Sequence, residues 1–185
     1  MSEENLCTYT NYKNGNLACI PKGIRILTNV GYIKVEKLKI KDLIITQDNR
    51  LVPIIKIFKS THEYNNNTAP RIIPKDMFFK NYPPMDIKLS TGHGIFVGDF
   101  IFIDCLCNDY KDKIIIEPKE NFKKTNYKID YYHIVLPDFF SDNLIIEGGT
   151  IIESFPYNLD YQHDYNYSQN PINNLYKKYR INNFY

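Results

Sequence analysis

Short runs of apolar, β-branched and aromatic residues recur along most of this chain, and most of them end at turn-forming residues. The runs lie at residues 24–28, 32–35, 43–46, 52–58, 87–90, 95–97, 100–103, 114–116, 131–136, 144–146 and 151–154. Gly, Pro, Asn and Asp between them favour turns, because these residues readily adopt the backbone angles that turns require. Many short, closely spaced strands indicate a compact all-β fold with a curved or closed sheet.

The ends of the chain differ from its middle in composition. Residues 1–18 are polar and are expected to form a short leader, whereas residues 155–185 are rich in Tyr and Asn and are expected to form a partly ordered tail. Residues 19–154 hold the strand-like runs and are expected to form one domain. Helical periodicity is weak, and a helix is expected only at residues 172–179.

Charge and hydropathy exclude several classes of partner. With 185 residues and a net charge of only +2, the chain lacks the dense basic face that is typical of nucleic-acid binding. No apolar run approaches the roughly 20 residues that cross a bilayer, so no membrane partner is expected. The first ten residues are polar and acidic, so we expect an intracellular protein with reduced cysteines. Heavy use of Asn, Ile, Lys and Tyr is typical of an AT-rich coding sequence.

One cysteine stands at the start of the β-rich region. Cys19 opens the segment CIPKGIRILTNVGYIKVEKLKIKDLIITQD, and the peptide bond from Ala18 lies directly before it. Such a thiol can attack the carbonyl carbon of its own preceding residue and turn the amide into a thioester. The reaction needs a group that removes the thiol proton and a group that protonates the leaving nitrogen. Imidazole suits the second task because its pKa lies near neutrality.

Three blocks of this sequence resemble a known family. They are the Cys19-led segment, the segment LSTGH at residues 89–93, and the pair YHIVL at 132–136 with NLIIEG at 143–148. In the first block the matching residues are Gly23, Thr28, Gly31, Val35, Glu36, Leu38 and Asp42. The order and spacing of the blocks resemble a Hint module, which occurs in hedgehog autoprocessing domains, inteins and bacterial relatives. The resemblance implies a compact, pseudo-symmetric β fold.

The resemblance also implies roles for individual residues. Cys19 would be the nucleophile, and His93 would hydrogen-bond the Cys19 amide nitrogen. Ser90 stands where the family has a Thr that polarises or twists the same peptide. His133 stands where the family has an Asp, and it is the fourth candidate catalytic residue. The thioester would then react with water, another thiol or an alcohol.

The sequence departs from the splicing members of the family at its end. Inteins close on His-Asn, and this Asn cyclises, whereas the matching pair here is Glu153-Ser154, which resembles the bacterial branch. The His that often precedes the penultimate strand is replaced by Asp142, which is otherwise read as a turn residue. Splicing is therefore not expected. The expected reaction is cleavage of the Ala18–Cys19 bond, with the chain's own N-terminal segment as the substrate.

Each candidate also has a structural interpretation. Cys19 is interpretable as a small buried hydrophobe, His93 as a turn residue, Ser90 as a strand-end hydroxyl and His133 as a core histidine. The alternative function is therefore a catalytically silent Hint-like scaffold that binds a protein partner, with the C-terminal tail as the contact. Cys105 and Cys107 share a strand face without a second ligand pair at zinc-like spacing, and His62 and His163 are expected in polar surface loops. No metal or cofactor is expected.

Overall fold

The computed structural model describes residues 19–98, 100–103, 112–138 and 141–155, and these residues are mostly strands. The strands are β1 (Ile20–Pro21), β2 (Arg25–Thr28), β3 (Gly31–Lys34), β4 (Leu43–Ile45), β5 (Leu51–Pro53), β6 (Lys56–Glu63), β7 (Arg71–Ile73), β8 (Ile87–Leu89), β9 (Gly94–Phe96), β10 (Phe100–Phe102), β11 (Ile115–Ile116), β12 (Lys128–Val135), β13 (Leu144–Ile146) and β14 (Thr150–Ile152). Two short 3₁₀ helices, η2 (Val35–Lys37) and η3 (Lys119–Thr125), lie between them. The expected all-β fold is confirmed.

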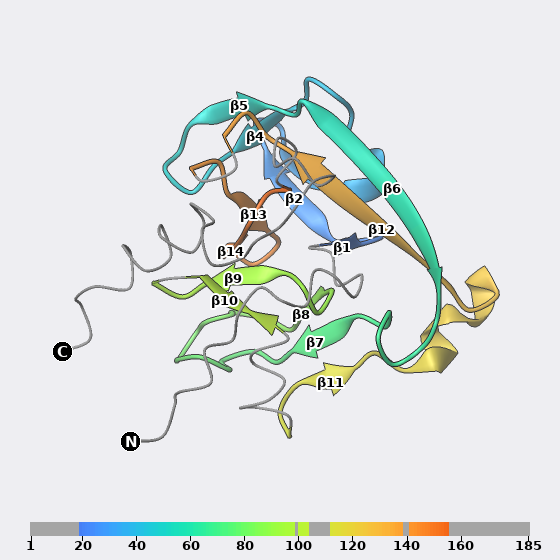
Figure 1. Ribbon diagram of the computed structural model, residues 1–185. Coiled ribbons are helices and arrows are strands. Elements are labelled where there is room, and N and C mark those ends of the chain that lie inside the picture. The colour runs from blue at the N-terminus through green and yellow to red at the C-terminus, as the bar shows by residue number, and fades with distance from the viewer. Residues whose placement is uncertain (1–18, 99, 104–111, 139–140, 156–185) are drawn as a thin grey trace, which may run out of the picture.

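The strands form three sheets that pack around one core (Figure 1). The largest sheet has the order β10-β9-β14-β13-β2-β4-β5, with β3 paired to β2, so it joins strands from both halves of the chain. A second sheet, β1-β12-β6, is dominated by the long antiparallel pair β6 and β12, which runs along one side of the molecule (Figure 1). The third sheet has the order β11-β7-β8.

Aliphatic side chains fill the space between the sheets. The fully buried ones are mostly isoleucines, because β-branched side chains pack well on pleated surfaces. They come from all three sheets and include Ile20, Ile26, Ile44, Ile73, Leu89, Ile95, Ile134, Leu144, Ile146 and Ile152. Burial of each such side chain contributes roughly 1.5–3 kcal/mol to folding. Four of the residues discussed below flank these packed strands: Cys19 precedes β1, Ser90 follows β8, His93 precedes β9 and Glu153 follows β14, whereas His133 lies within β12.

The expected strand at residues 52–58 is instead two strands that belong to different sheets. The amide of Ile54 donates to the carbonyl of Asp42, next to β4, whereas the amide of Ile55 donates to the carbonyl of Val135 in β12. Two consecutive amides therefore pair with two different sheets, and the chain crosses from β5 to β6 at this point. The crossing does not show in the sequence because isoleucines stand on both sides of it, although Ile54 is 1% exposed and Ile55 is 47% exposed.

Some elements lie where the sequence gave no clear signal. Strands β1 and β7 are only two and three residues long and were not expected. His62 was expected in a surface loop, which is wrong: it lies in β6, partly buried, with its ring edge-on to Tyr131 at 5.9 Å.

The expected leader at 1–18, the helix at 172–179 and all of the tail except residue 155 lie outside the described residues. No helix within the described part of the chain is long and apolar enough to cross a membrane.

Candidate functional site

The pairing of β1 with β12 brings Cys19 to His133. The two strands are antiparallel, with Ile20 opposite Tyr132 and Pro21 opposite Tyr131. One step further along this register, Cys19 lies opposite His133, at the separation where side chains of facing residues touch. The Cys19 Sγ atom is 3.4 Å from His133 Nε2. The atom of His133 that faces the thiol is therefore the ring nitrogen Nε2.

The alternation of β12 explains why His133 faces inward. Along Lys128–Val135, Ile129, Tyr131 and His133 are buried, since residues two apart share a strand face. Ile129 and Tyr131 pack with Cys19 in a small apolar cluster. His133 is only 4% exposed, and its ring packs edge-on against Phe155 at 4.7 Å. The histidine therefore has a fixed place beside the thiol.

Ser90 holds the backbone of Cys19 from the end of β8. The Cys19 amide donates to Ser90 Oγ at 2.8 Å, and the Ser90 amide donates to the Cys19 carbonyl at 3.2 Å. The expected hydrogen bond from this amide nitrogen to His93 is thus replaced by one to Ser90. The hydroxyl takes the bond because Ser90 immediately follows β8, which ends beside the start of β1. Ser90 fixes the nitrogen of the peptide bond that Cys19 would break.

A tight turn brings His93 close to the same point. The His93 amide donates to the Ser90 carbonyl at 3.3 Å, and the Ile103 amide donates to the His93 carbonyl at 3.1 Å. His93 is 1% exposed. Its Nδ1 atom has no hydrogen-bond partner and lies 4.0 Å from Glu153 Oε1. A buried imidazole nitrogen without a partner is uncommon in folded proteins and is typical of functional sites.

Glu153 reaches His93 through the pairing of β14 with β9. Ile152 lies opposite Ile95, so the same register places Glu153 opposite Gly94. The Gly94 amide donates to Glu153 Oε1 at 3.1 Å, and Glu153 is 2% exposed. A Cβ atom at Gly94 would lie 3.4 Å from the Glu153 carboxyl carbon and 3.1 Å from Phe100 Cδ1. Glycine at this position leaves room for the carboxyl group.

Burial keeps both central groups uncharged. Burial raises the pKa of the Cys19 thiol to about 12, although the hydrogen bond from Ser90 acts in the opposite direction. Burial also lowers the pKa of His93 to about 3, and the neighbouring charge of His133 lowers it further. At neutral pH the thiol is protonated and His93 is a neutral imidazole. The thiol therefore needs an adjacent base, which its contact with His133 can supply.

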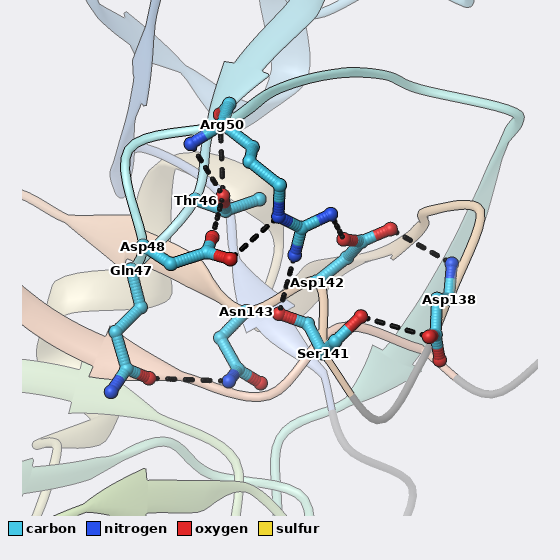
Figure 2. Close-up of polar contacts among 8 residues, drawn as sticks. All are labelled: Thr46, Gln47, Asp48, Arg50, Asp138, Ser141, Asp142 and Asn143. Atoms are coloured by element: carbon cyan, nitrogen blue, oxygen red, sulfur yellow. Dashed lines mark hydrogen bonds and ion pairs between the residues drawn. The ribbon is translucent and has the colours of Figure 1, made fainter.

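A second polar cluster, around Asp142, anchors the loop before β13 (Figure 2). Asp142 is 1% exposed, and its Oδ1 atom lies 2.8 Å from Arg50 Nη1. Its Oδ2 atom accepts from the Asp138 amide at 2.8 Å, while Arg50 also binds Asp48 and donates to the Ser141 carbonyl. These contacts link the β4–β5 turn to the 138–142 loop. They give Asp142, the residue at the position of the family's His, a structural role at the loop.

A cavity of about 440 Å³ lies next to the Cys19 cluster. Phe122 and Ile129 line it and also pack in that cluster, while Lys22, Lys88 and Glu117 make its rim polar. Cys19 itself is not among the residues that line this cavity. Within the ranges that the structure describes, no three His, Cys, Asp or Glu side chains gather as a metal site. Cys105, Cys107 and His163 lie outside those ranges.

The structure gathers all four candidate residues and adds one. Cys19 contacts both Ser90 and His133 directly, and His93 lies in the turn that follows Ser90. Glu153 was noticed in the sequence only as part of an unusual ending. The available signal was its position directly after the apolar residues of a strand, where a carboxyl group becomes buried. A buried charged residue needs a specific partner.

A comparison with protein families identifies the family of this chain. The sequence model of the Hint domain matches residues 18–157. A bacterial intein-like domain from Clostridium thermocellum is similar in structure, with 12% sequence identity, a TM-score of 0.49 and coverage of 75% of this chain and 99% of that one. A splice-inactive variant of the AceL NrdHF class 3 split intein is 11% identical, with a TM-score of 0.45 and coverage of 76% and 99%. No curated protein sequence matches. The chain belongs to the Hint domain family.

Proposed function

We propose that this Hint domain cleaves its own chain between Ala18 and Cys19 through a thioester, without splicing. The proposal rests on two contacts of Cys19, one at its sulfur and one at its amide. Its thiol lies 3.4 Å from His133 Nε2, and its amide donates to Ser90 Oγ at 2.8 Å. A structural cysteine needs no imidazole at its sulfur. Nucleophilic catalysis by a thiol needs a base at the sulfur and control of the leaving nitrogen.

The first step forms the thioester. His133 Nε2 takes the proton from Cys19 Sγ, and the sulfur attacks the carbonyl carbon of residue 18. The new bond joins Sγ to that carbon, and the bond from the carbon to the Cys19 nitrogen breaks. An adjacent base is required because the pKa of the buried thiol is about 12, so its thiolate is scarce at neutral pH.

The leaving nitrogen must gain a proton as the bond breaks. Ser90 keeps this nitrogen in a fixed direction, and His93, in the turn that follows, gives it the proton. General acid help of this kind contributes roughly 10²- to 10⁴-fold in rate. Water or an added thiol then attacks the thioester carbon and releases residues 1–18.

The intact mass of the purified full-length chain tests the proposal. Dithiothreitol or hydroxylamine should convert it to two fragments that meet between residues 18 and 19, since both reagents capture thioesters. The variant Cys19→Ala should stay whole under the same conditions. A wild-type chain that stays whole with both reagents contradicts the proposal.

A silent scaffold is the second candidate, and one observation favours it. Cys19 is 5% exposed and lies in an apolar cluster with Ile129 and Tyr131. A cysteine in such surroundings also serves as a small hydrophobe. In that case Cys19→Ala would change stability alone, and the domain would act by binding a protein partner. The same mass measurement separates the two candidates, because a scaffold yields no fragments.

A further inference from the structure

We propose that Glu153 is a positioning and proton-supplying residue for His93, and that the two side chains share one proton during cleavage. The proposal rests on the proposed function and extends it to a residue outside the thiol's own contacts. It is based on the distance between the two side chains. Glu153 Oε1 lies 4.0 Å from His93 Nδ1, which is buried and has no hydrogen-bond partner.

The backbone holds the two groups in place from opposite strands. Glu153 follows β14, Gly94 begins β9, and His93 precedes Gly94. The Glu153 amide donates to the Gly94 carbonyl at 3.4 Å, and the Gly94 amide donates back to Glu153 Oε1 at 3.1 Å. The carboxyl group of Glu153 is therefore held by Gly94, the residue that directly follows His93. Catalytic contacts are often long in a resting site and shorten during reaction, so 4.0 Å is within reach of proton exchange.

The burial of His93 and Glu153 makes a charge on either side chain costly. His93 and Glu153 are 1% and 2% exposed. A lone buried carboxylate costs several kcal/mol, and so does a lone buried imidazolium. A carboxylic acid beside a neutral imidazole avoids both costs with a single proton. Another titratable group near His93 is His133, on β12, and its charge favours a neutral His93.

A neutral His93 that donates its ring proton must receive another proton if it is to stay neutral. When its ring gives a proton to the Cys19 nitrogen, Nδ1 takes the proton from the Glu153 carboxyl group. The thiol proton has meanwhile moved to His133. The products are a thioester, a free amine, an imidazolium at His133 and a carboxylate at Glu153. One positive and one negative charge appear together, so the site stays neutral.

The rate of thiol-dependent cleavage of the full-length chain tests this relay. Glu153→Gln keeps the size of the side chain but removes its acid, and it should slow cleavage about 10²-fold. Ser154→Ala is the matched control, because Ser154 is next in sequence, equally buried, and its Oγ atom has no hydrogen-bond partner. It should cleave at the wild-type rate. Equal rates for wild type and Glu153→Gln would overturn the relay.

A second readout does not depend on cleavage. In the uncleavable Cys19→Ala chain, we expect the 4.0 Å separation to close in solution, so the ¹⁵N shift of His93 Nδ1 should report a hydrogen-bonded acceptor. Glu153→Ala in that background leaves no donor at this place and should move the shift toward the value of a free nitrogen. The His133 shifts should stay in place, and the amide spectrum shows whether the variant is folded. A free Nδ1 in the Cys19→Ala chain itself would overturn the pairing. If that pairing is seen but the wild type never cleaves, the proposed function fails and the pairing stands.

Discussion

The Sγ atom of Cys19 lies 3.4 Å from Nε2 of His133, 114 positions further along the chain. The antiparallel register of β1 and β12 produces this contact, since it places the two residues opposite each other. The sequence offered His133 only as a substitute for an Asp in the family pattern. Its place at the sulfur makes it the base in the proposed reaction. In the proposed reaction the two histidines have different tasks: His133 acts at the thiol, and His93 supplies the proton for the leaving nitrogen.

Removal of His133 should make cleavage depend on hydroxide. With the thiol pKa at about 12, the thiolate is rare at neutral pH unless a base assists. His133→Ala should therefore slow cleavage about 10²-fold near pH 7. Its rate should then rise in proportion to hydroxide concentration, while the wild-type rate rises less steeply. Rates from intact mass between pH 6 and 10 measure both, and His62→Ala, on the neighbouring strand β6, is the control. Parallel profiles for wild type and His133→Ala would rule out His133 as the base.

Removal of the Ser90 hydroxyl should affect both stability and cleavage. Ser90→Ala leaves the buried amide of Cys19 without its 2.8 Å acceptor, which costs about 1–3 kcal/mol in unfolding free energy. Cleavage should also slow, because the leaving nitrogen loses its fixed direction. Thr91→Ala removes a hydroxyl from the next residue, which is also 9% exposed. Chemical denaturation and intact mass would show the two effects. If both variants behave alike, the hydrogen bond to Ser90 carries no special role.

Alkaline pH should weaken the fold through Cys19. Burial raises the thiol pKa from its ordinary value near 9 to about 12, so between these values the folded chain keeps a proton that the unfolded chain loses. The contribution of Cys19 is full below pH 9 and falls as pH rises, by about 1.4 kcal/mol per pH unit. Cys19→Ala lacks this dependence. Unfolding free energies of both chains at pH 8 to 10.5 should therefore converge as pH rises. A constant difference would mean that the thiol is already solvated in the fold.

The cluster around Asp142 should contribute to stability and leave the chemistry alone. Arg50→Ala removes the cation 2.8 Å from a carboxyl group that is 1% exposed. Because the Arg50 side chain is 44% exposed, solvent partly replaces it, and we expect a measurable loss of unfolding free energy. Asp48→Asn, which alters the exposed partner of the same Arg50, should lower the unfolding free energy less than Arg50→Ala does. Cleavage rates of the folded variants should match the wild type. A large rate loss in Arg50→Ala would place this loop in the reaction.

Much of the fold could be predicted from local patterns. Hairpins such as β2–β3 and β9–β10 have apolar runs with turn residues between them, so their existence was confirmed at nearly the expected bounds. Short strands such as β1 and β7 have too few residues to show alternation. The crossing between Ile54 and Ile55 was also hidden, because both residues are apolar and only their hydrogen-bond partners differ.

The candidate site was predictable as a set of residues but not as a geometry. Cys19, Ser90, His93 and His133 all came from the family pattern, and the fold brings them together. Which histidine faces the thiol depends on the register of β1 against β12, and no local pattern encodes a register between strands more than a hundred residues apart. Glu153 was missed as a candidate for the same reason, since only the pairing of β14 with β9 places it at His93.

The most direct test of self-cleavage is the intact mass of the full-length chain, with and without dithiothreitol, beside Cys19→Ala and His93→Ala. The account predicts a break between residues 18 and 19 in the wild type that the thiol accelerates. It predicts no break in Cys19→Ala and a break slowed by about 10²-fold or more in His93→Ala, with both variants folded. A wild-type chain that keeps its full mass under these conditions, or a Cys19→Ala chain that still breaks there, would contradict it.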